Sequence, residues 1–360
     1  MIVKAKGFPS LDSWNVMQLS VKKLDGLSIF NPKSGITRDL ARNVVRLEYG
    51  DIPSDVVCIA KTAFLDATGC MLTGALQESS RKVLRYARGL GGSPDATCVY
   101  YGDRTNIYNA ALVNGTFCHN SEFDHVFRLG VNCESVLIPA VIAAAEKRIA
   151  NGHEVITSLV AGWEVMNRLA AAASIIPLKR SLDPISTFGP FGAAAAGGKI
   201  SRFNDFDMEN ALTCCPAQAA GTLQFTQTNC ESGRLTSGFA ASYGLRAANM
   251  AREGISGARD ILEGRSGFFM CIAGLRDDGT PKFNVDKVND SYGRKWYMRD
   301  FLSETSGEGN ERFRERATLA GISGTRQDRV IEIVNNLEEQ DDMIHLMSNL
   351  TISKGVGRLG

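Results

Sequence analysis

Apolar residues recur every three and four positions through most of this chain, which is the spacing of one face of an α-helix. The clearest run begins after Pro53 and Ser54, a pair that favours a helix start, and ends near Gly69. This run is predicted to form an amphipathic helix that faces a core. Its apolar positions are Val56, Val57, Ala60, Ala63, Phe64 and Ala67.

Several later segments have the same helical spacing. Residues 135–150 are apolar over most of their surface, and Asn151-Gly152 separates them from a second helical pattern at residues 153–173. So short a connection predicts that these two helices pack antiparallel. Residues 188–200, FGPFGAAAAGGKI, are almost all small, which predicts a buried central helix crossed closely by its neighbours. Further helical patterns lie at residues 204–212, 237–252, 310–319, 328–337 and 343–350.

Strand signals are few. Residues 97–101 are the best candidate, because Gly92-Ser93-Pro94 and Gly102 bound them. Residues 275–309 are richer in Gly, Asp and Ser and have no clear period, and no internal repeat recurs at a fixed period. The chain is therefore predicted to be mainly α-helical. Its 360 residues, 44% hydrophobic and 22% charged, suit an ordinary globular protein with a large core.

The charge balance bears on which partners the protein can have. The chain has 40 basic and 39 acidic residues, so no overall field attracts nucleic acid or an anionic membrane. The first 20 residues lack the continuous apolar stretch of a signal peptide, and no run reaches the roughly 20 apolar residues needed to cross a bilayer. We expect no nucleic-acid or membrane partner, and a cytoplasmic location with the mitochondrial matrix as the alternative.

The nine cysteines are scattered, with no C-x-x-C pair. The odd number and the spacing argue against a disulfide framework and against structural zinc. Most of these thiols are predicted to be reduced and to pack as small, buried apolar residues. Cys214-Cys215 lies beside Ala211 in a predicted helix, which favours packing over nucleophilic catalysis, and His153 and His345 are also expected to be structural.

The densest polar cluster comprises His119, Glu122, Asp124 and His125, within seven residues. Steps of three residues would place His119, Glu122 and His125 on one side of a helical turn. Such a group can act as an acid–base pair; a hydrogen-bond network that anchors a helix start is the alternative. Metal binding is chemically possible, but His-x-x-Glu-x-x-His is not an established ligand spacing, and no metal is expected.

Several short motifs also occur in a fixed order along the chain. They are Asn114-Gly115 followed by His119 and EFDH, LVAGWEV at residues 159–165, Asp183-Pro184 before the alanine run, Arg234-Leu235 before Gly238, ILEG and GFF at residues 261–269, and the helical pattern at residues 330–350. In order and spacing these motifs resemble the MmgE/PrpD family of helical lyases, which includes 2-methylcitrate dehydratase and cis-aconitate decarboxylase.

The resemblance implies a large helical domain with an inserted α/β lid domain, a homodimer, and chemistry without a metal or another cofactor. Here the lid is missing or reduced, because the chain passes almost directly from Trp296-Tyr297 to the C-terminal helices. We therefore expect an N-terminal extension (1–35), a helical domain (36–283), a remnant or junction of the lid (284–309), and C-terminal helices that complete the helical domain (310–350).

The chain departs from the family pattern at several polar positions. Glu122 and His125 replace aspartates, Asn132-Cys133 and Asp183-Pro184 replace His-Pro pairs, Gly233 replaces a lysine, and Thr236 replaces a histidine. The candidate catalytic residues are His119, Glu122, Asp124, His125 and Asp183. The candidates for substrate binding are Asn132, Arg234 and Arg265, since arginine suits bidentate contact with a carboxylate. Surface arginines with no such role are the alternative.

The function that this resemblance implies is that of a lyase acting on a polycarboxylic acid. The leading hypothesis is a dehydratase of a 2-methylcitrate-like or alkylcitrate-like substrate, in a specialised biosynthetic pathway. A decarboxylase of the cis-aconitate kind is the nearest alternative. A non-catalytic scaffold protein without a lid is the alternative from another class, because three cationic or proton-transferring positions have become Asn132, Asp183 and Gly233.

Overall fold

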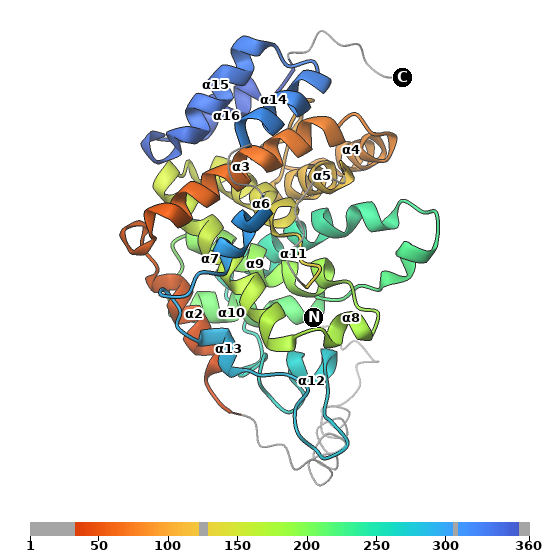
Figure 1. Ribbon diagram of the computed structural model, residues 1–360, viewed down its shortest axis with the longest axis vertical. Helices are drawn as coiled ribbons and strands as arrows, with labels where there is room; N and C mark the ends of the chain where they lie inside the picture. The colour runs from red at the N-terminus through yellow and green to blue at the C-terminus, as the bar shows by residue number, and fades with distance from the viewer. Residues whose placement is uncertain (1–32, 122–128, 305–308, 353–360) are drawn as a thin grey trace, which may run out of the picture.

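The computed structural model describes residues 33–121, 129–304 and 309–352. Within these residues the fold is mainly helical, as the apolar spacing predicts, with one two-stranded antiparallel sheet (Figure 1). The helices are α2 (Ile36–Arg46), α3 (Ser54–Gly74), α4 (Glu78–Leu90), α5 (Ile107–Asn120), α6 (Cys133–Arg148), α7 (Gly152–Ala173), α8 (Ile176–Lys179), α9 (Pro184–Ile200), α10 (Asp205–Cys214), α11 (Thr236–Arg252), α12 (Phe268–Ile272), α13 (Asp286–Asn289), α14 (Gly309–Leu319), α15 (Gly324–Asn335) and α16 (Ile344–Asn349). The short 3-10 helices are η2 (Tyr49–Asp51), η3 (Cys215–Ala217), η4 (Leu223–Gln227), η5 (Ser232–Leu235), η6 (Tyr297–Glu304) and η7 (Leu337–Glu339).

Helix α9 is the most enclosed element, and it packs against α6, α7, α10 and α11. Its small residues allow these helices to come close. An ideal Cβ on Gly192 would lie 2.9 Å from the backbone oxygen of Gly162 in α7, and one on Gly244 of α11 would lie 2.4 Å from the Cβ of Ala193. The predicted close crossing at residues 188–200 is thus confirmed, because these crossings leave no room for a larger side chain.

Helix α3 is a long apolar helix inside the fold. Among the described residues it alone has the length and composition to cross a membrane, so the expectation that no run would reach that length is wrong for Ser54–Gly74. However, 83% of its most apolar window is buried inside the structure. Its apolar character is explained by packing against α5 and α14.

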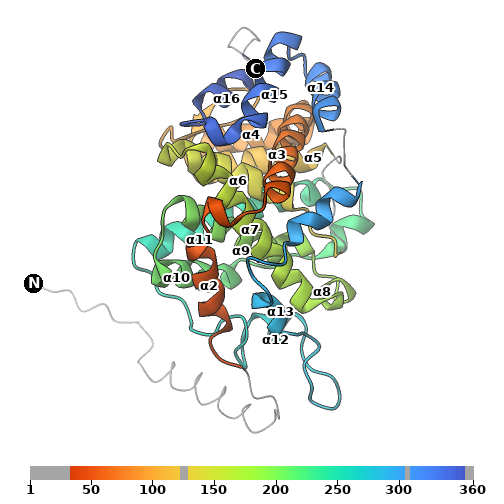
Figure 2. The same cartoon turned by 60° about the vertical axis from the view of Figure 1, so that its left-hand side comes forward.

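The C-terminal helices lie beside the early part of the chain. In both views α14 and α15 sit next to α3, although more than two hundred residues separate them in sequence, and α16 packs on α15 (Figures 1 and 2). The Arg316 side chain of α14 crosses α3 at Gly69, where an ideal Cβ would lie 3.2 Å from the Cδ of Arg316. The C-terminal helices therefore form part of the same core as α3.

The segment between α12 and α14 is fixed to α7 by one buried arginine. Arg168 is 0% exposed, and its guanidinium donates to the backbone oxygens of Asp290 and Lys295, each at 2.7 Å. The same guanidinium lies over the rings of Tyr292 and Tyr297, at 4.6 and 5.3 Å from the ring centres. This part of the residues 284–309, expected to be a lid remnant, is thus packed against the helical core.

The one described sheet is shorter than the predicted strand. Strand β1 (Ala96–Thr97) pairs with β2 (Arg104–Thr105), and Tyr100 then turns the chain with a φ of 71°. Beyond Thr97, the Asn114 side chain takes the place of a neighbouring strand, accepting from the backbone nitrogen of Val99 and donating to the backbone oxygen of Thr97. The strand predicted for residues 97–101 is therefore wrong beyond Thr97. The Asn114 side chain that binds the backbone there is a tertiary contact, which the local sequence does not reveal.

The cysteines follow the prediction made for most of them. Five are buried, Cys214 is partly buried, and three are exposed, namely Cys58, Cys230 and Cys271; all nine are free thiols. Burial raises the pKa of the Cys98 thiol far above its ordinary value. These buried thiols are therefore neutral packing residues.

Candidate active site

Four helix ends meet at one place in the fold, which we call the helix-end junction: the C-terminal end of α5 and the N-terminal ends of α6, α9 and α11. The hydroxyls of Ser135 and Ser237 share a hydrogen bond of 2.8 Å that joins the first turns of α6 and α11. Before α6, an ideal Cβ on Gly130 would lie 3.3 Å from the Cγ of Pro184, in the first turn of α9. Helix α5 packs against both α6 and α11.

The electrostatics of the junction favour an anion. Helix N-termini carry a partial positive charge and several backbone N–H groups without intrahelical partners. Asn132, the N-cap of α6, is 5% exposed, and its side chain makes no capping bond to the first turn. A carboxylate at this position would meet the N–H groups of α6, in the way that helix N-termini bind anions.

Asp183 is buried as the N-cap of α9. Its carboxylate accepts from the backbone nitrogens of Ile185 and Ser186, at 3.3 and 3.0 Å, and from the Ser186 hydroxyl at 2.5 Å. Its own backbone nitrogen donates to the oxygen of Gly221 at 3.1 Å, which ties the residues before η4 to α9. These are the contacts of a helix cap, so the structure supplies a structural role for the residue that sequence reasoning named as catalytic.

His119 lies in the last turn of α5, and its side chain is partly buried. The backbone of α5 near its C-terminal end packs directly on the backbone of α11. An ideal Cβ on Gly115 would lie only 2.7 Å from the Cα of Gly238 in α11, so there is no room for a side chain between the two helices. The other predicted acid–base residues, Glu122, Asp124 and His125, lie outside the described residues. Of the predicted cluster, the structure thus places His119 alone at the edge of the junction.

Arg234 and Gly233 belong to η5, which leads directly into α11. Arg234 is partly buried. Gly233, where the resemblance implies a lysine, packs against an aromatic ring, since an ideal Cβ there would lie 2.4 Å from the Cδ2 of Phe225. A larger side chain at this position would require Phe225 to move.

Arg265 lies between α11 and α12, outside the four helix ends of the junction. It is exposed, in the turn before α12, and the neighbouring Glu263 accepts from the backbone nitrogen of Thr37, at 3.2 Å, at the start of α2. The structure thus brings Asn132, Asp183, Arg234 and His119 to the ends of helices that meet, and it places Arg265 on the turn that fixes α2.

A buried group of charges behind α6 was not found by sequence reasoning. Asp66 of α3 and Glu134 in the first turn of α6 are both 0% exposed. Asp66 pairs with Arg312 and Arg316 of α14, at 3.0 and 2.8 Å. The signal in the sequence was Asp66, which interrupts the apolar stretch from Ala63 to Met71, because a buried carboxylate requires a cationic partner.

Glu134 belongs to the same electrostatic group, which we call the Asp66 cluster (Asp66, Glu134, Arg312 and Arg316). Burial acts to lower the pKa of Arg316, but Cys70, Asp66 and Glu134 together raise it above its ordinary value. Arg316 therefore stays charged and stabilises the carboxylates of both α3 and α6. Glu134, in the first turn of α6, adds to the electrostatic field at Arg316 of α14.

Two kinds of chemistry find little support in the described residues. Cys133 begins α6, but burial raises the pKa of its thiol far above the ordinary value, and Asn167 donates to its sulfur at 3.2 Å. A neutral, enclosed thiol is a poor nucleophile. Within residues 33–121, 129–304 and 309–352, no three His, Cys, Asp or Glu side chains are placed to hold a metal ion. What the junction offers is the N-terminal end of α6, whose N–H groups have no side-chain cap, beside the N-terminal end of α9, which Asp183 caps.

The sequence matches the MmgE/PrpD N-terminal domain over residues 38–279, which includes all four helices of the junction. It is 27% identical to a cis-aconitate decarboxylase-like protein of Aspergillus oryzae over 343 residues, covering 89% of this chain and 67% of that protein. It is 28% identical to the cis-aconitate decarboxylase of Aspergillus terreus over 276 residues, covering 74% of this chain and 56% of that enzyme. The human cis-aconitate decarboxylase is 26% identical over 241 residues, 65% of this chain and 49% of the human protein. The chain thus spans about half of the length of the Aspergillus terreus and human relatives it matches.

Proposed function

The chain belongs to the MmgE/PrpD family, and we propose that it is a lyase that removes carbon dioxide from cis-aconitate or a closely related tricarboxylate. The observation that carries this proposal is the similarity to cis-aconitate decarboxylases across the residues that build the junction. It favours the alternative named from the sequence over the dehydratase, because the relatives are named for decarboxylation.

The reaction needs few groups. The bond between carbon and one carboxylate breaks, carbon dioxide leaves, and the electron pair that stays on the carbon skeleton takes up one proton. The protein must therefore hold the remaining carboxylates and deliver a proton to carbon. A cationic or N–H-rich site with one proton donor is sufficient, and the reaction requires no base to remove a proton first.

We assign the carboxylate-binding role to the N–H groups of α6 beside Asn132 and to the guanidinium of Arg234. Arg234 is preferred over Arg265 because η5 leads into the junction, whereas Arg265 is exposed on the turn that fixes α2. The proton donor is proposed to be His119, together with the acid–base residues Glu122, Asp124 and His125 of the connection between α5 and α6. Asp183 is proposed to hold the start of α9 in position.

The test of the reaction uses the purified full-length chain with cis-aconitate, 2-methylcitrate and longer alkylcitrates. We expect carbon dioxide to be released from cis-aconitate and no new alkene absorbance from the alkylcitrates. Alkene formation from an alkylcitrate without carbon dioxide would restore the dehydratase. If no acid were turned over, the non-catalytic scaffold would be the better description.

Substitutions test the assigned residues. His119→Gln should lower kcat by about 100-fold or more, the usual loss for a general acid. His153→Gln is the matched control, because His153 stacks on Tyr49 with ring centres 3.9 Å apart and lies in another part of the fold. Arg234→Gln should raise KM while Arg265→Gln leaves it unchanged. An equal increase in KM in the two variants would indicate that Arg265 also binds the substrate.

We also propose, as the resemblance implies, that the protein is a homodimer in the cytoplasm or the mitochondrial matrix. The molar mass from light scattering tests the dimer, and a monomeric mass at micromolar concentration would exclude it. Imaging of a tagged full-length chain tests the location.

A further inference from the structure

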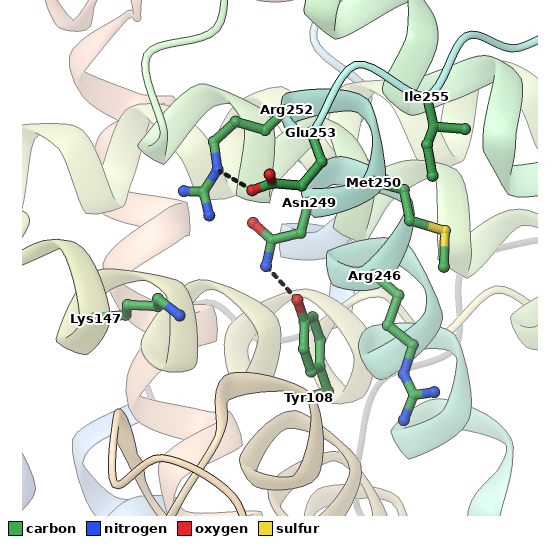
Figure 3. A pocket seen from close by; sticks show the side chains of 8 residues that line it. All are labelled: Tyr108, Lys147, Arg246, Asn249, Met250, Arg252, Glu253 and Ile255. Atoms are coloured by element: carbon green, nitrogen blue, oxygen red, sulfur yellow. Dashed lines mark hydrogen bonds and ion pairs between the residues drawn. The ribbon is translucent and has the colours of Figure 1, made fainter. Parts of the chain in front are cut away.

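A pocket lies at the C-terminal end of α11, the end opposite the helix-end junction, and Figure 3 shows its lining residues. We call it the α11 pocket. Helix α11 has 17 residues, and at about 1.5 Å per residue its two ends are roughly 25 Å apart. The pocket has a volume of about 460 Å³ and is lined by Tyr108, Lys147, Arg246, Asn249, Met250, Arg252, Glu253 and Ile255.

The lining is richer in cations than in anions. Lys147 pairs with Asp95 at 3.0 Å, and Arg252 has only a loose contact with Glu253, at 3.9 Å. Among the described residues, Arg246 has no carboxylate partner, and its Nε is buried without a hydrogen-bond acceptor. A partly buried guanidinium without an acceptor is a group that an oxyanion would stabilise.

Arg148, which is not among the lining residues, adds positive charge near Arg252. It follows Lys147 in the last turn of α6, and the structure gives it no carboxylate partner within the described part of the chain. Burial first, and then the charge of Arg252, lower the pKa of Arg148. The ends of α6 and α11 therefore bring like charges together. The partial negative charge of a helix C-terminus stabilises cations, which accounts for Arg148 and Arg252 at the ends of α6 and α11. It does not account for Arg246, which lies further from the end of α11.

The pocket also has an apolar and aromatic side. The guanidinium of Arg246 lies over the Tyr108 ring at 5.5 Å from its centre, and Asn249 donates to the Tyr108 hydroxyl, which fixes the ring. Met250 and Ile255 are 42% and 51% exposed and supply the apolar surface of the lining. Figure 3 shows Asn249 and Tyr108 between Lys147 and the Met250 side of the pocket.

We propose that the α11 pocket binds a small organic molecule that carries two or more phosphate or carboxylate groups, at a site separate from the helix-end junction. The arginines and Lys147 contact the oxyanions, and Tyr108, Met250 and Ile255 contact the carbon skeleton. This inference is independent of the proposed decarboxylase, because it requires only the geometry of the pocket.

The experiment is isothermal titration of the full-length chain with tripolyphosphate, adenosine triphosphate and citrate, at constant ionic strength. We expect saturable binding of at least one probe, and a Kd raised at least tenfold in the Arg246→Gln/Arg252→Gln double variant. Arg294→Gln, which removes an exposed arginine outside the pocket, is the matched control and should bind as the wild type does. Tighter binding of the phosphates would identify a phosphate ligand, and tighter binding of citrate a polycarboxylate.

A second variant guards against a folding effect. Met250→Glu introduces a carboxylate at an exposed lining position without removing the contact between Arg246 and Tyr108. It should also raise Kd at least tenfold while the thermal midpoint stays within a few degrees of the wild type. The proposal is overturned if no probe binds saturably, or if the double variant and Met250→Glu bind with the Kd of the wild type. Citrate binding that is abolished by Arg234→Gln instead would assign the anion to the junction.

Discussion

Two groups of buried charges, one on α7 and one behind the helix-end junction, differ in how their charges are compensated. On α7, Glu164 and Arg168 lie one turn apart on one helix, with 3.0 Å between Arg168 Nε and the Glu164 carboxylate. Arg168 is also satisfied by two backbone oxygens and two tyrosine rings. The Asp66 cluster instead joins side chains from three helices, α3, α6 and α14.

The difference shows what each group holds together. The α7 pair needs only one helix to form, and its remaining contacts fix the chain from Asp290 to Met298, whose backbone nitrogen donates to Glu164 at 3.2 Å. The Asp66 cluster forms only when the C-terminal helices reach α3. Because Glu134 lies in the first turn of α6 and contributes to the field at Arg316, we expect that cluster to couple C-terminal packing to the candidate active site. We therefore expect damage to the α7 pair to lower stability, and damage to the Asp66 cluster to lower both stability and activity.

The largest effect is expected from Arg168→Met. Removing one partner of a buried ion pair leaves the other uncompensated, and the free energy of unfolding should fall by about 3–5 kcal/mol. Urea unfolding followed by circular dichroism measures this. Arg329→Met, at an exposed pair with Glu332, is the control and should change stability by less than about 0.5 kcal/mol. An Arg168→Met protein as stable as the control would show that the pair is not important for folding.

Asp66→Asn sharpens the comparison between the two groups. It leaves Arg312 and Arg316 without their buried carboxylate, so stability should fall by about 3 kcal/mol. If the cluster positions α6, kcat should also fall in the folded fraction of the protein, with a smaller change in KM. Steady-state kinetics at a temperature where the variant is folded gives that separation. Unchanged kcat in folded Asp66→Asn would reduce the cluster to a purely structural role.

The pH dependence of stability is expected to arise partly from Glu164. Burial, opposed by Arg168, raises the pKa of Glu164 from 4.5 to about 7. The folded state then binds a proton that the unfolded state has lost, so this group's contribution to stability falls as pH rises from about 4.5 to 7, by about 1–3 kcal/mol. Thermal midpoints measured across this range should flatten in Glu164→Gln. The prediction is contradicted if the thermal midpoint of the wild type depends on pH in the same way as that of Glu164→Gln.

The smallest effect concerns Asp183, where a cap and a catalytic carboxylate make different predictions. Asp183→Ala removes the capping side chain and should cost about 1 kcal/mol. Asp183→Ser keeps a capping oxygen without a carboxylate, so it should restore most of that stability. If Asp183 only caps α9, Asp183→Ser should also retain nearly full kcat. A loss of kcat by 100-fold or more in a stable Asp183→Ser protein would support the catalytic role named from the sequence.

Much of the fold followed from the sequence because helices are determined by local spacing and by residues next to their ends. Asn151-Gly152 marked the boundary between two helices, where the Asn151 side chain caps α7 by accepting from the backbone nitrogen of Glu154, and the small residues of α9 predicted its close crossings. Arg234 and Asn132 were named from motifs, and each is found at the start of an element that enters the junction.

What failed at the level of sequence failed for a tertiary reason. The strand at residues 97–101 ended early because the Asn114 side chain replaced a neighbouring strand. The partners of Asp66 were out of reach, because Arg312 and Arg316 lie about 250 residues further along the chain. An apolar run interrupted by one carboxylate predicts that a partner exists, but spacing along the chain carries no information about which distant helix supplies it.

By itself, therefore, the sequence determined the helices, their caps, the small-residue crossings and membership of the family. Only the tertiary structure decided that the N-terminal ends of α6, α9 and α11 meet, that the C-terminal helix α14 supplies the cations behind α6, and that cations gather at the far end of α11. The physical reason is that helix formation depends on neighbours within four or five residues. Charge compensation and site assembly depend on side chains that only packing brings together.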